Sequence, residues 1–236
     1  MIEVINRRKF LKFSLHTKIV IVMNLILIVV GTLLILVVEF YNPYTLGEMD
    51  SFGKFVNSCF MSISCRTAGF NSFDLSETGQ VSQLSMILLM FIGASPLSTG
   101  GGIKCTTFFI IVMIIWSLLR GKNRVSVFGR SIPTALRDQS FAIFTMGTIW
   151  VVTVSIILSI IDNERHELLE VIFETVSGFG TVGMGIGITN DWTAAGKLLL
   201  SLTMLVGRVG IMTFMLALIA QKNTAVKYPE ENIMIG

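Results

Sequence analysis

The sequence predicts an all-α membrane protein of two tandem repeats, each with a spanning helix, a half-length helix, a glycine-bearing loop and a second span. Three observations support this prediction. Of the 236 residues, 53% are hydrophobic and 14% are charged, which is too little charge for the surface of a soluble domain. Apolar runs of spanning length recur along the chain. The same spacing of threonine and glycine occurs in both halves.

Two apolar runs are long enough to cross a bilayer as single helices, which takes about 20 residues. They cover residues 19–41 and 139–161, and the second run has no charged residue. Two further apolar regions are interrupted. A stretch rich in serine, proline and glycine divides the region 82–119, and Arg208 lies near the centre of the region 194–220.

A shorter apolar stretch lies between each uninterrupted span and its interrupted partner. These stretches cover residues 52–65 and 168–178. They are too short to cross the bilayer as helices, so we expect half-membrane helices. Each leads into a run of glycine and other small residues.

The positions of lysine and arginine predict the orientation. Twelve of the eighteen basic residues precede the first span, join the two halves or follow the last span. The positive-inside rule then places both termini in the cytoplasm of a multi-pass protein of the cell membrane. The predicted organisation is a basic cytoplasmic N-terminus (1–18), a first repeat (19–120), a basic cytoplasmic linker (121–138), a second repeat (139–221) and a cytoplasmic tail (222–236).

The two halves carry matching turns, Thr67-Ala68-Gly69 and Thr181-Val182-Gly183. The distance from Gly69 to Gly93 is 24 residues, and the distance from Gly183 to Gly207 is also 24. A repeated unit that cannot complete a pore alone implies further copies around an axis. Two copies therefore predict half of a pseudo-four-fold cation pore.

The chemistry of these turns suits a cation filter. Backbone carbonyls replace the hydration shell of a monovalent cation without a fixed charge that would trap it. Glycine tolerates the torsions that point successive carbonyls inward, and a helix C-terminus presents partial negative charge. The alternative is a pair of re-entrant turns with a structural role only. The candidate filter residues are Thr67, Ala68, Gly69, Thr181, Val182 and Gly183.

Two charged residues lie at positions of membrane depth. Arg208 is costly there unless it faces water or a partner. It is either an electrostatic barrier facing the pore or a structural tie to Glu174 or to loop carbonyls, and the two roles are compatible. Lys104 either reaches the cytoplasmic interface or faces the pore. We expect Glu174 itself to accept hydrogen bonds from nearby backbone donors.

The sequence offers no catalytic or metal-binding set. The three cysteines have no CxxC spacing, and the two histidines lie on opposite sides of the predicted membrane. The GxGxxG match over 178–183 lacks a preceding strand, and Asp191 follows too soon to be its acidic partner. The basic residues do not share one surface. We therefore predict no enzyme, no cofactor, no metal and no nucleic-acid partner.

Four runs, over 65–70, 93–104, 179–183 and 207–210, resemble the C-terminal half of the Trk/Ktr/HKT potassium transporters, most closely the KtrB type of membrane subunit. Family members carry four repeats, so the resemblance implies repeats three and four. It also implies potassium uptake, passive or sodium-assisted, by a pore-forming subunit with filter glycines at Gly69 and Gly183.

The resemblance further implies that residues 94–104, the intramembrane loop, form a gate under the filter beside Arg208. A break rich in glycine, serine and proline within the membrane must line a cavity, which agrees with this implication. The candidate gate residues are Ser95, Ser98, Thr99, Gly100, Gly101, Gly102, Lys104 and Arg208.

Partners also follow from the resemblance. We expect an N-terminal half with two further repeats if the chain is a fragment or the product of a split gene. We also expect a homodimer, membrane lipid and a cytoplasmic nucleotide-binding regulatory ring of the KtrA/TrkA type. Two alternatives remain open. One is a sodium-permeable HKT-like transporter, and the other is a truncated, non-conducting scaffold that binds a regulatory subunit.

Overall fold

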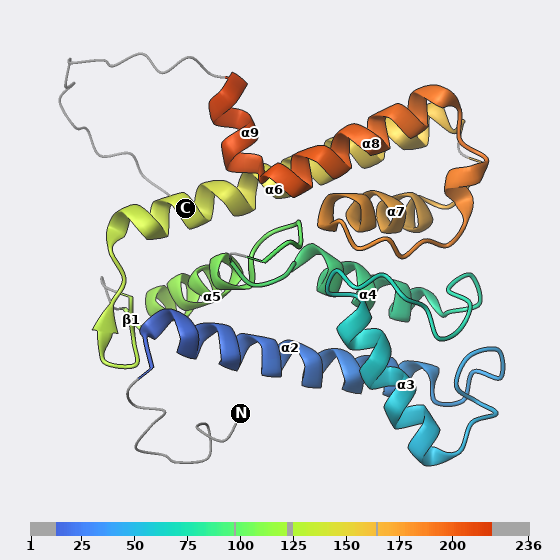
Figure 1. Cartoon of the computed structure of the whole chain (residues 1–236), viewed down its shortest axis with the longest axis horizontal. Coiled ribbons are helices and arrows are strands. Elements are labelled where there is room, and N and C mark those ends of the chain that lie inside the picture. The colour runs from blue at the N-terminus through green and yellow to red at the C-terminus, as the bar shows by residue number, and fades with distance from the viewer. Residues whose placement is uncertain (1–12, 97, 122–124, 164, 219–236) are drawn as a thin grey trace.

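The computed structural model describes residues 13–96, 98–121, 125–163 and 165–218. Helices dominate this part of the chain (Figure 1). The predicted cytoplasmic tail and most of the predicted N-terminus lie outside the described residues. The elements are α2 (Leu15–Glu39), α3 (Ser51–Ser64), α4 (Gln80–Phe91), α5 (Cys105–Leu119), β1 (Ser126–Val127), β2 (Arg130–Ser131), α6 (Thr134–Ile161), α7 (Leu168–Gly180), η2 (Ile188–Asn190), α8 (Ala194–Val209) and α9 (Ile211–Leu218).

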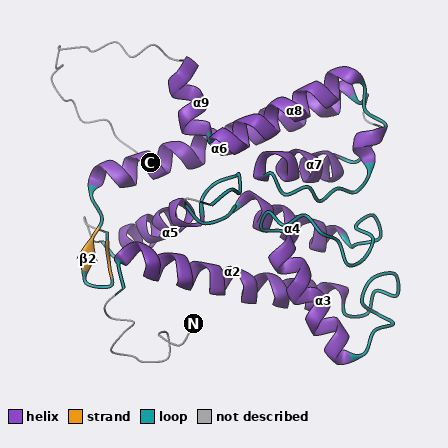
Figure 2. Cartoon of the chain, in the orientation of Figure 1, coloured by secondary structure: helices purple, strands orange, loops and turns teal. Residues whose placement is uncertain are grey.

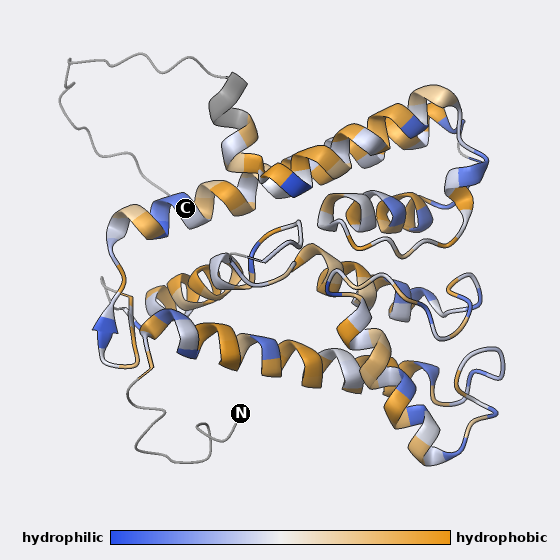
Figure 3. Ribbon diagram, viewed as in Figure 1, coloured by the Kyte–Doolittle hydropathy of each residue, from blue (hydrophilic) through white to orange (hydrophobic). Residues whose placement is uncertain are grey.

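The helices α2 and α6 are long and apolar enough to cross a bilayer, at 25 and 28 residues. In α2 the buried side chains recur every fourth position, as at Ile19, Met23 and Leu27. Leucine and valine on the opposite face remain exposed, with Leu25 at 62% and Val37 at 73%. Figure 3 shows hydrophobic residues recurring along α2. An exposed face of this composition suits contact with lipid.

The two halves share backbone geometry at matched positions. α4 begins at Gln80 and α8 begins at Ala194, which is the same separation as that between Gly69 and Gly183. The halves then diverge, as the spacing of their glycines indicates. α4 ends at Phe91 and the intramembrane loop follows it, whereas α8 continues to Val209 and the chain bends at Gly210 (φ 92°) into α9.

The linker departs from the all-α prediction. Within it β1 and β2 form an antiparallel hairpin (Figure 2). Its turn residues Phe128 and Gly129 both have positive φ, at 49° and 75°, as a two-residue turn of type I′ requires. α6 then begins at Thr134, five residues before the predicted start of the span. The predicted linker over 121–138 therefore contains the hairpin and the first turn of α6.

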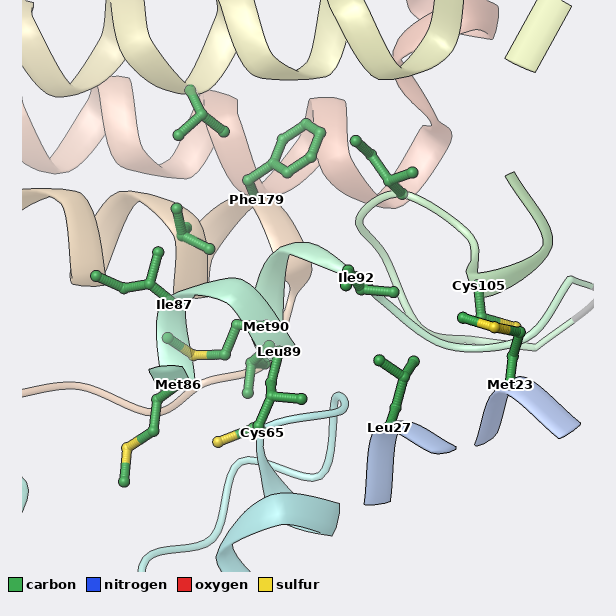
Figure 4. Close-up of a cluster of buried hydrophobic side chains, with 14 of the residues drawn as sticks. Met23, Leu27, Cys65, Met86, Ile87, Leu89, Met90, Ile92, Cys105 and Phe179 are labelled. Atoms are coloured by element: carbon green, nitrogen blue, oxygen red, sulfur yellow. The ribbon is translucent and has the colours of Figure 1, made fainter. Parts of the chain in front are cut away.

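The two halves meet where α4 packs against α7 and where α5 packs against α6, and α7 also packs against α6 and α8. The ring of Phe91 at the end of α4 stacks on that of Phe179 with their centroids 6.0 Å apart. Figure 4 shows the surrounding core, which includes Met90 and Phe179, and in which Cys65 and Cys105 fill buried positions without a disulfide. The C-terminal ends of both half-helices, α3 and α7, lie near the middle of the fold (Figure 1).

Candidate cation pathway

Each half-helix ends in a turn with left-handed residues. In the first turn (67–69) the φ angles of Thr67 and Gly69 are 73° and 78°, and in the second turn (181–183) those of Thr181 and Gly183 are 51° and 89°. For threonine this region costs about 1–2 kcal/mol. Left-handed residues redirect the carbonyls away from the helical direction. The matching threonines therefore give both turns the same irregular backbone.

A serine from the preceding half-helix closes each turn. The hydroxyl of Ser64 donates to the carbonyl of Phe70, and the hydroxyl of Ser177 donates to the carbonyl of Met184. Phe70 and Met184 each follow the glycine of their turn. These serines were not predicted from the sequence, because their spacing to the turn glycines differs between the halves. Ser64 lies five residues before Gly69, and Ser177 lies six residues before Gly183. A search for serine near each turn, without strict spacing, would have found them.

The two turns lie against each other. A Cβ atom on Gly69 would collide with the carbonyl oxygen of Val182, so the main chains approach as closely as only glycine allows. A Cβ atom on Gly183 would meet nothing within 4 Å. At position 69, both the lack of room for a side chain and the positive φ angle therefore require glycine. At position 183, only the positive φ angle requires it.

Backbone hydrogen bonds join the two ends of the intramembrane loop. The N–H of Gly93 donates to the carbonyl of Ile103 at 2.8 Å, and the N–H of Cys105 donates to the carbonyl of Ala94 at 3.3 Å. Ile92 and Ile103 form an isolated parallel bridge. These contacts fix the ends of the loop, which leaves the middle residues to reach the two turns.

The middle of the loop contacts the threonines of both turns. The N–H of Gly101 donates to Oγ1 of Thr181 at 2.8 Å. A Cβ atom on Gly100 would lie 2.7 Å from Oγ1 of Thr67, and one on Gly101 would lie 2.7 Å from the Thr181 side chain. Larger residues at these positions would push the loop away from the turns.

The remaining candidate gate residues extend the same loop. Gly102 has a φ of 70°, and a Cβ atom there would lie 3.3 Å from the Cα atom of Gly180. The Ser98 hydroxyl donates to the carbonyl of Ser95 at 2.6 Å. Ser98 and Thr99 are exposed in the described part of the chain.

Two basic side chains donate to carbonyls of the loop. Arg208 donates through Nη1 to Thr99, and Lys104 donates through Nζ to Gly100. Of the partners considered for Arg208, the structure therefore shows a loop carbonyl. Glu174 instead accepts from the N–H groups of Ile186 and Gly187, at 3.0 and 3.3 Å. The structure thus brings Thr67, Gly69, Thr181 and Val182 of the turns together with Gly100 and Gly101 of the loop, and it joins Arg208 and Lys104 to loop carbonyls.

The sequence model of the TrkH family, described as a cation transport protein, matches residues 1–227. The chain belongs to this family. Its relatives include two Ktr system potassium uptake proteins B. One, from Vibrio alginolyticus, is 37% identical over 230 residues, which cover 98% of this chain and 50% of the relative. The other, from Bacillus subtilis, is 35% identical over 236 residues, which cover 100% and 53%.

Other similarities extend this result. The potassium/sodium uptake protein NtpJ of Enterococcus hirae is 34% identical over 239 residues, which cover 99% of this chain and 53% of the relative. The crystal structure of the potassium transporter TrkH from Vibrio parahaemolyticus aligns with a TM-score of 0.70 at 20% identity, over 90% of this chain and 46% of that one. At this identity the match shows the fold. The chain spans about half the length of the curated relatives it matches.

Proposed function

We propose that this member of the TrkH family supplies two of the four pore-lining segments of a potassium uptake transporter. The observation that carries the proposal is the contact between the two turns, where the carbonyl of Val182 lies directly against Gly69. Turns with matched left-handed residues at the C-terminal ends of two half-helices present main-chain oxygens to one place. The relatives named as potassium uptake proteins support potassium as the ion.

In this proposal the carbonyls of 67–69 and 181–183 replace part of the hydration shell of the ion. The C-terminal ends of α3 and α7 add partial negative charge. The other oxygens come from a partner half with two further repeats, which completes the pseudo-four-fold pore. Transport then follows the membrane potential, where 100 mV is worth about 2.3 kcal/mol per charge, or about fifty-fold accumulation.

The intramembrane loop is the gate of this pathway. The hydrogen bond from the Gly101 N–H to Thr181 keeps the loop against the second turn. The hydrogen bond from Arg208 to the Thr99 carbonyl adds a positive charge to the loop. A loop in this position blocks the path below the turns, and the positive charge of Arg208 repels a passing ion. Opening then requires Gly101 and Thr99 to leave these partners.

The surroundings of the pore are part of the same proposal. The termini and the linker are cytoplasmic, and the protein crosses the cell membrane several times. Two copies of the complete subunit form a dimer on a nucleotide-binding regulatory ring. The exposed Arg130 and the partly exposed Arg137, which flank the start of α6, lie on the side that would face this ring.

Sodium permeation is the second candidate function. A specific observation favours it, since one relative is named a potassium/sodium uptake protein. Glycine at both turns, Gly69 and Gly183, favours potassium. The ratio of rubidium to sodium uptake distinguishes the two candidates.

Growth of potassium-auxotrophic cells tests the proposal. The cells express the complete transporter, with this chain joined to its N-terminal half, in medium of low potassium. We expect growth, and loss of growth when Gly69 is replaced by a bulky residue. A failure to restore growth, with the protein present in the membrane at normal level, would leave the scaffold function as the better account.

A further inference from the structure

A polar cluster within the membrane links α2 to the first turn and to the intramembrane loop. Arg66 immediately precedes Thr67, and its Nη1 donates to Oδ1 of Asn24. Its Nη2 lies 3.4 Å from the carbonyl of Gly93, which accepts a second hydrogen bond. An arginine at this depth is costly unless it is paired. The second repeat has Gly180 at the matching position, so the turn itself does not require arginine.

Asn24 joins the cluster to the loop. It is the only amide or charged side chain between residues 19 and 38. Its Nδ2 donates to Oγ of Ser95 at 3.1 Å and to the carbonyl of Val20 at 2.7 Å. Since Oδ1 accepts from Nη1 of Arg66, one amide pairs with the arginine and holds the loop at once.

The cluster holds a different part of the loop from the contacts described above. Gly93 immediately precedes the loop and Ser95 lies at its N-terminal end, whereas Thr99 and Gly101 bind the second repeat. A pocket of about 250 Å³ borders the cluster, and Ser98 also lines it. The loop is therefore attached to both repeats, with space beside the segment between its two attachments.

We propose that Asn24 and Arg66 are positioning residues that anchor the N-terminal end of the intramembrane loop to the first turn. The inference rests on the proposed function of the loop as a gate. During opening, Ser95 stays bound to Asn24, and the segment from Ser98 to Gly101 leaves the second repeat. The anchor thereby sets the closed position of the loop without contact with the ion.

The test measures rubidium uptake into liposomes that contain the complete transporter. Asn24→Leu removes both functions of the amide with little change in volume. Ser95→Ala removes the hydroxyl partner of Asn24, together with its weak contact with the Cys105 thiol at 3.8 Å. We expect Ser95→Ala to raise basal uptake about fivefold, the factor that the net free energy of one hydrogen bond gives. Asn24→Leu should raise it at least as much. The ratio of rubidium to sodium uptake should stay at the wild-type value, because neither side chain belongs to the turns.

The double variant separates this role from a purely structural one. If Asn24 and Ser95 act through their shared hydrogen bond, adding Ser95→Ala to Asn24→Leu raises uptake no further. Asn57→Leu is the matched control, because the Asn57 amide donates to Gly53 and Met49 near the start of α3, far from the loop. We expect wild-type uptake from this control. Ser95→Ala preserves the arginine pair, so it keeps the test valid if Asn24→Leu does not fold.

Three results would overturn the anchor. The first is wild-type uptake in Ser95→Ala. The second is an effect of the double variant equal to the product of the two single effects, and the third is a changed ratio of rubidium to sodium uptake. Each would show that Asn24 does not hold the loop. A wild-type transporter that takes up no rubidium would instead remove the proposed function. The two failures are therefore distinguishable in one set of measurements.

Discussion

The main-chain N–H of Gly101 donates a hydrogen bond of 2.8 Å to the hydroxyl of Thr181. Gly101 belongs to the intramembrane loop, and Thr181 is one of the two left-handed residues of the second turn. One hydrogen bond therefore links the segment proposed to block the pathway to the segment proposed to select the ion. This link makes the threonine a point at which gating and selection meet.

Replacement of Thr181 by valine tests this link. Thr181→Val removes the acceptor of the Gly101 N–H and keeps a side chain of similar shape. Loss of one hydrogen bond is worth about 1 kcal/mol, so we expect uptake to rise about fivefold as the loop leaves the turn more often. Rubidium uptake into liposomes measures the effect. Thr145→Val is the control, since among the described residues the Thr145 hydroxyl bonds the carbonyl of Phe141 in its own helix and no other group. Equal uptake in the two variants would contradict the link.

The two turn glycines should differ in their tolerance of alanine. Gly69→Ala places a Cβ atom onto the Val182 carbonyl and also strains a φ of 78°. Gly183→Ala meets open space and adds only the torsional cost, about 1–2 kcal/mol. We therefore expect Gly69→Ala to abolish potassium uptake and Gly183→Ala to reduce it. The reverse order of damage, measured by growth in low potassium, would contradict the close approach of the turns.

Arg208 should control the closed state through its bond with Thr99. Arg208→Ala removes both the donor and the positive charge, so we expect increased uptake. Arg208→Lys keeps the charge and should give an intermediate value, because lysine lacks the planar fork of arginine. The control is Lys197→Ala, which removes an exposed cation that binds Asn190 on another loop. Unchanged uptake in Arg208→Ala would remove Arg208 from the gate.

The serine that closes the second turn should control selection rather than gating. Ser177→Ala leaves the Met184 carbonyl without its hydroxyl donor, at a cost of about 1–3 kcal/mol for a buried group. We expect a lower ratio of rubidium to sodium uptake as the turn loosens. Ser155→Ala is the matched control, because in the described part of the chain the buried Ser155 hydroxyl has no hydrogen-bond partner. A normal ratio in Ser177→Ala would show that the turn keeps its geometry without the serine.

Much of the local structure could be predicted from the sequence. Glycine and threonine at matched spacing in the two halves indicate the two turns, because glycine is the residue that most readily adopts the irregular backbone of such a turn. The length of each apolar run predicts α2 and the half-helices, because the thickness of the bilayer sets the length of a spanning or half-spanning helix. The start of α6 at Thr134 was missed because Arg137 and Asp138 interrupt the apolar run. Both are exposed and form an ion pair at 3.0 Å.

The contacts between distant segments could not be predicted in the same way. Asn24 and Ser95 are 71 positions apart, and nothing in the pattern around either residue names the other. The partner of Arg208 stayed open for the same reason, because Glu174 and the loop carbonyls were both available to a charge at that depth. The packing of α2 and α7 against α4, and of α8 against α7, decides which polar groups meet. The type I′ turn at Phe128 was missed because phenylalanine is an unusual residue for positive φ.

The most direct measurement locates the ion itself. Crystals of the complete transporter grown in rubidium, or in thallium as a heavier substitute, give an anomalous signal at each bound cation. The account predicts a peak coordinated directly by the carbonyl oxygens of residues 67–69 and 181–183, on the side where Gly69 meets Val182. A bound cation found only elsewhere, with both turns free of it, would contradict the claim that these turns form the filter.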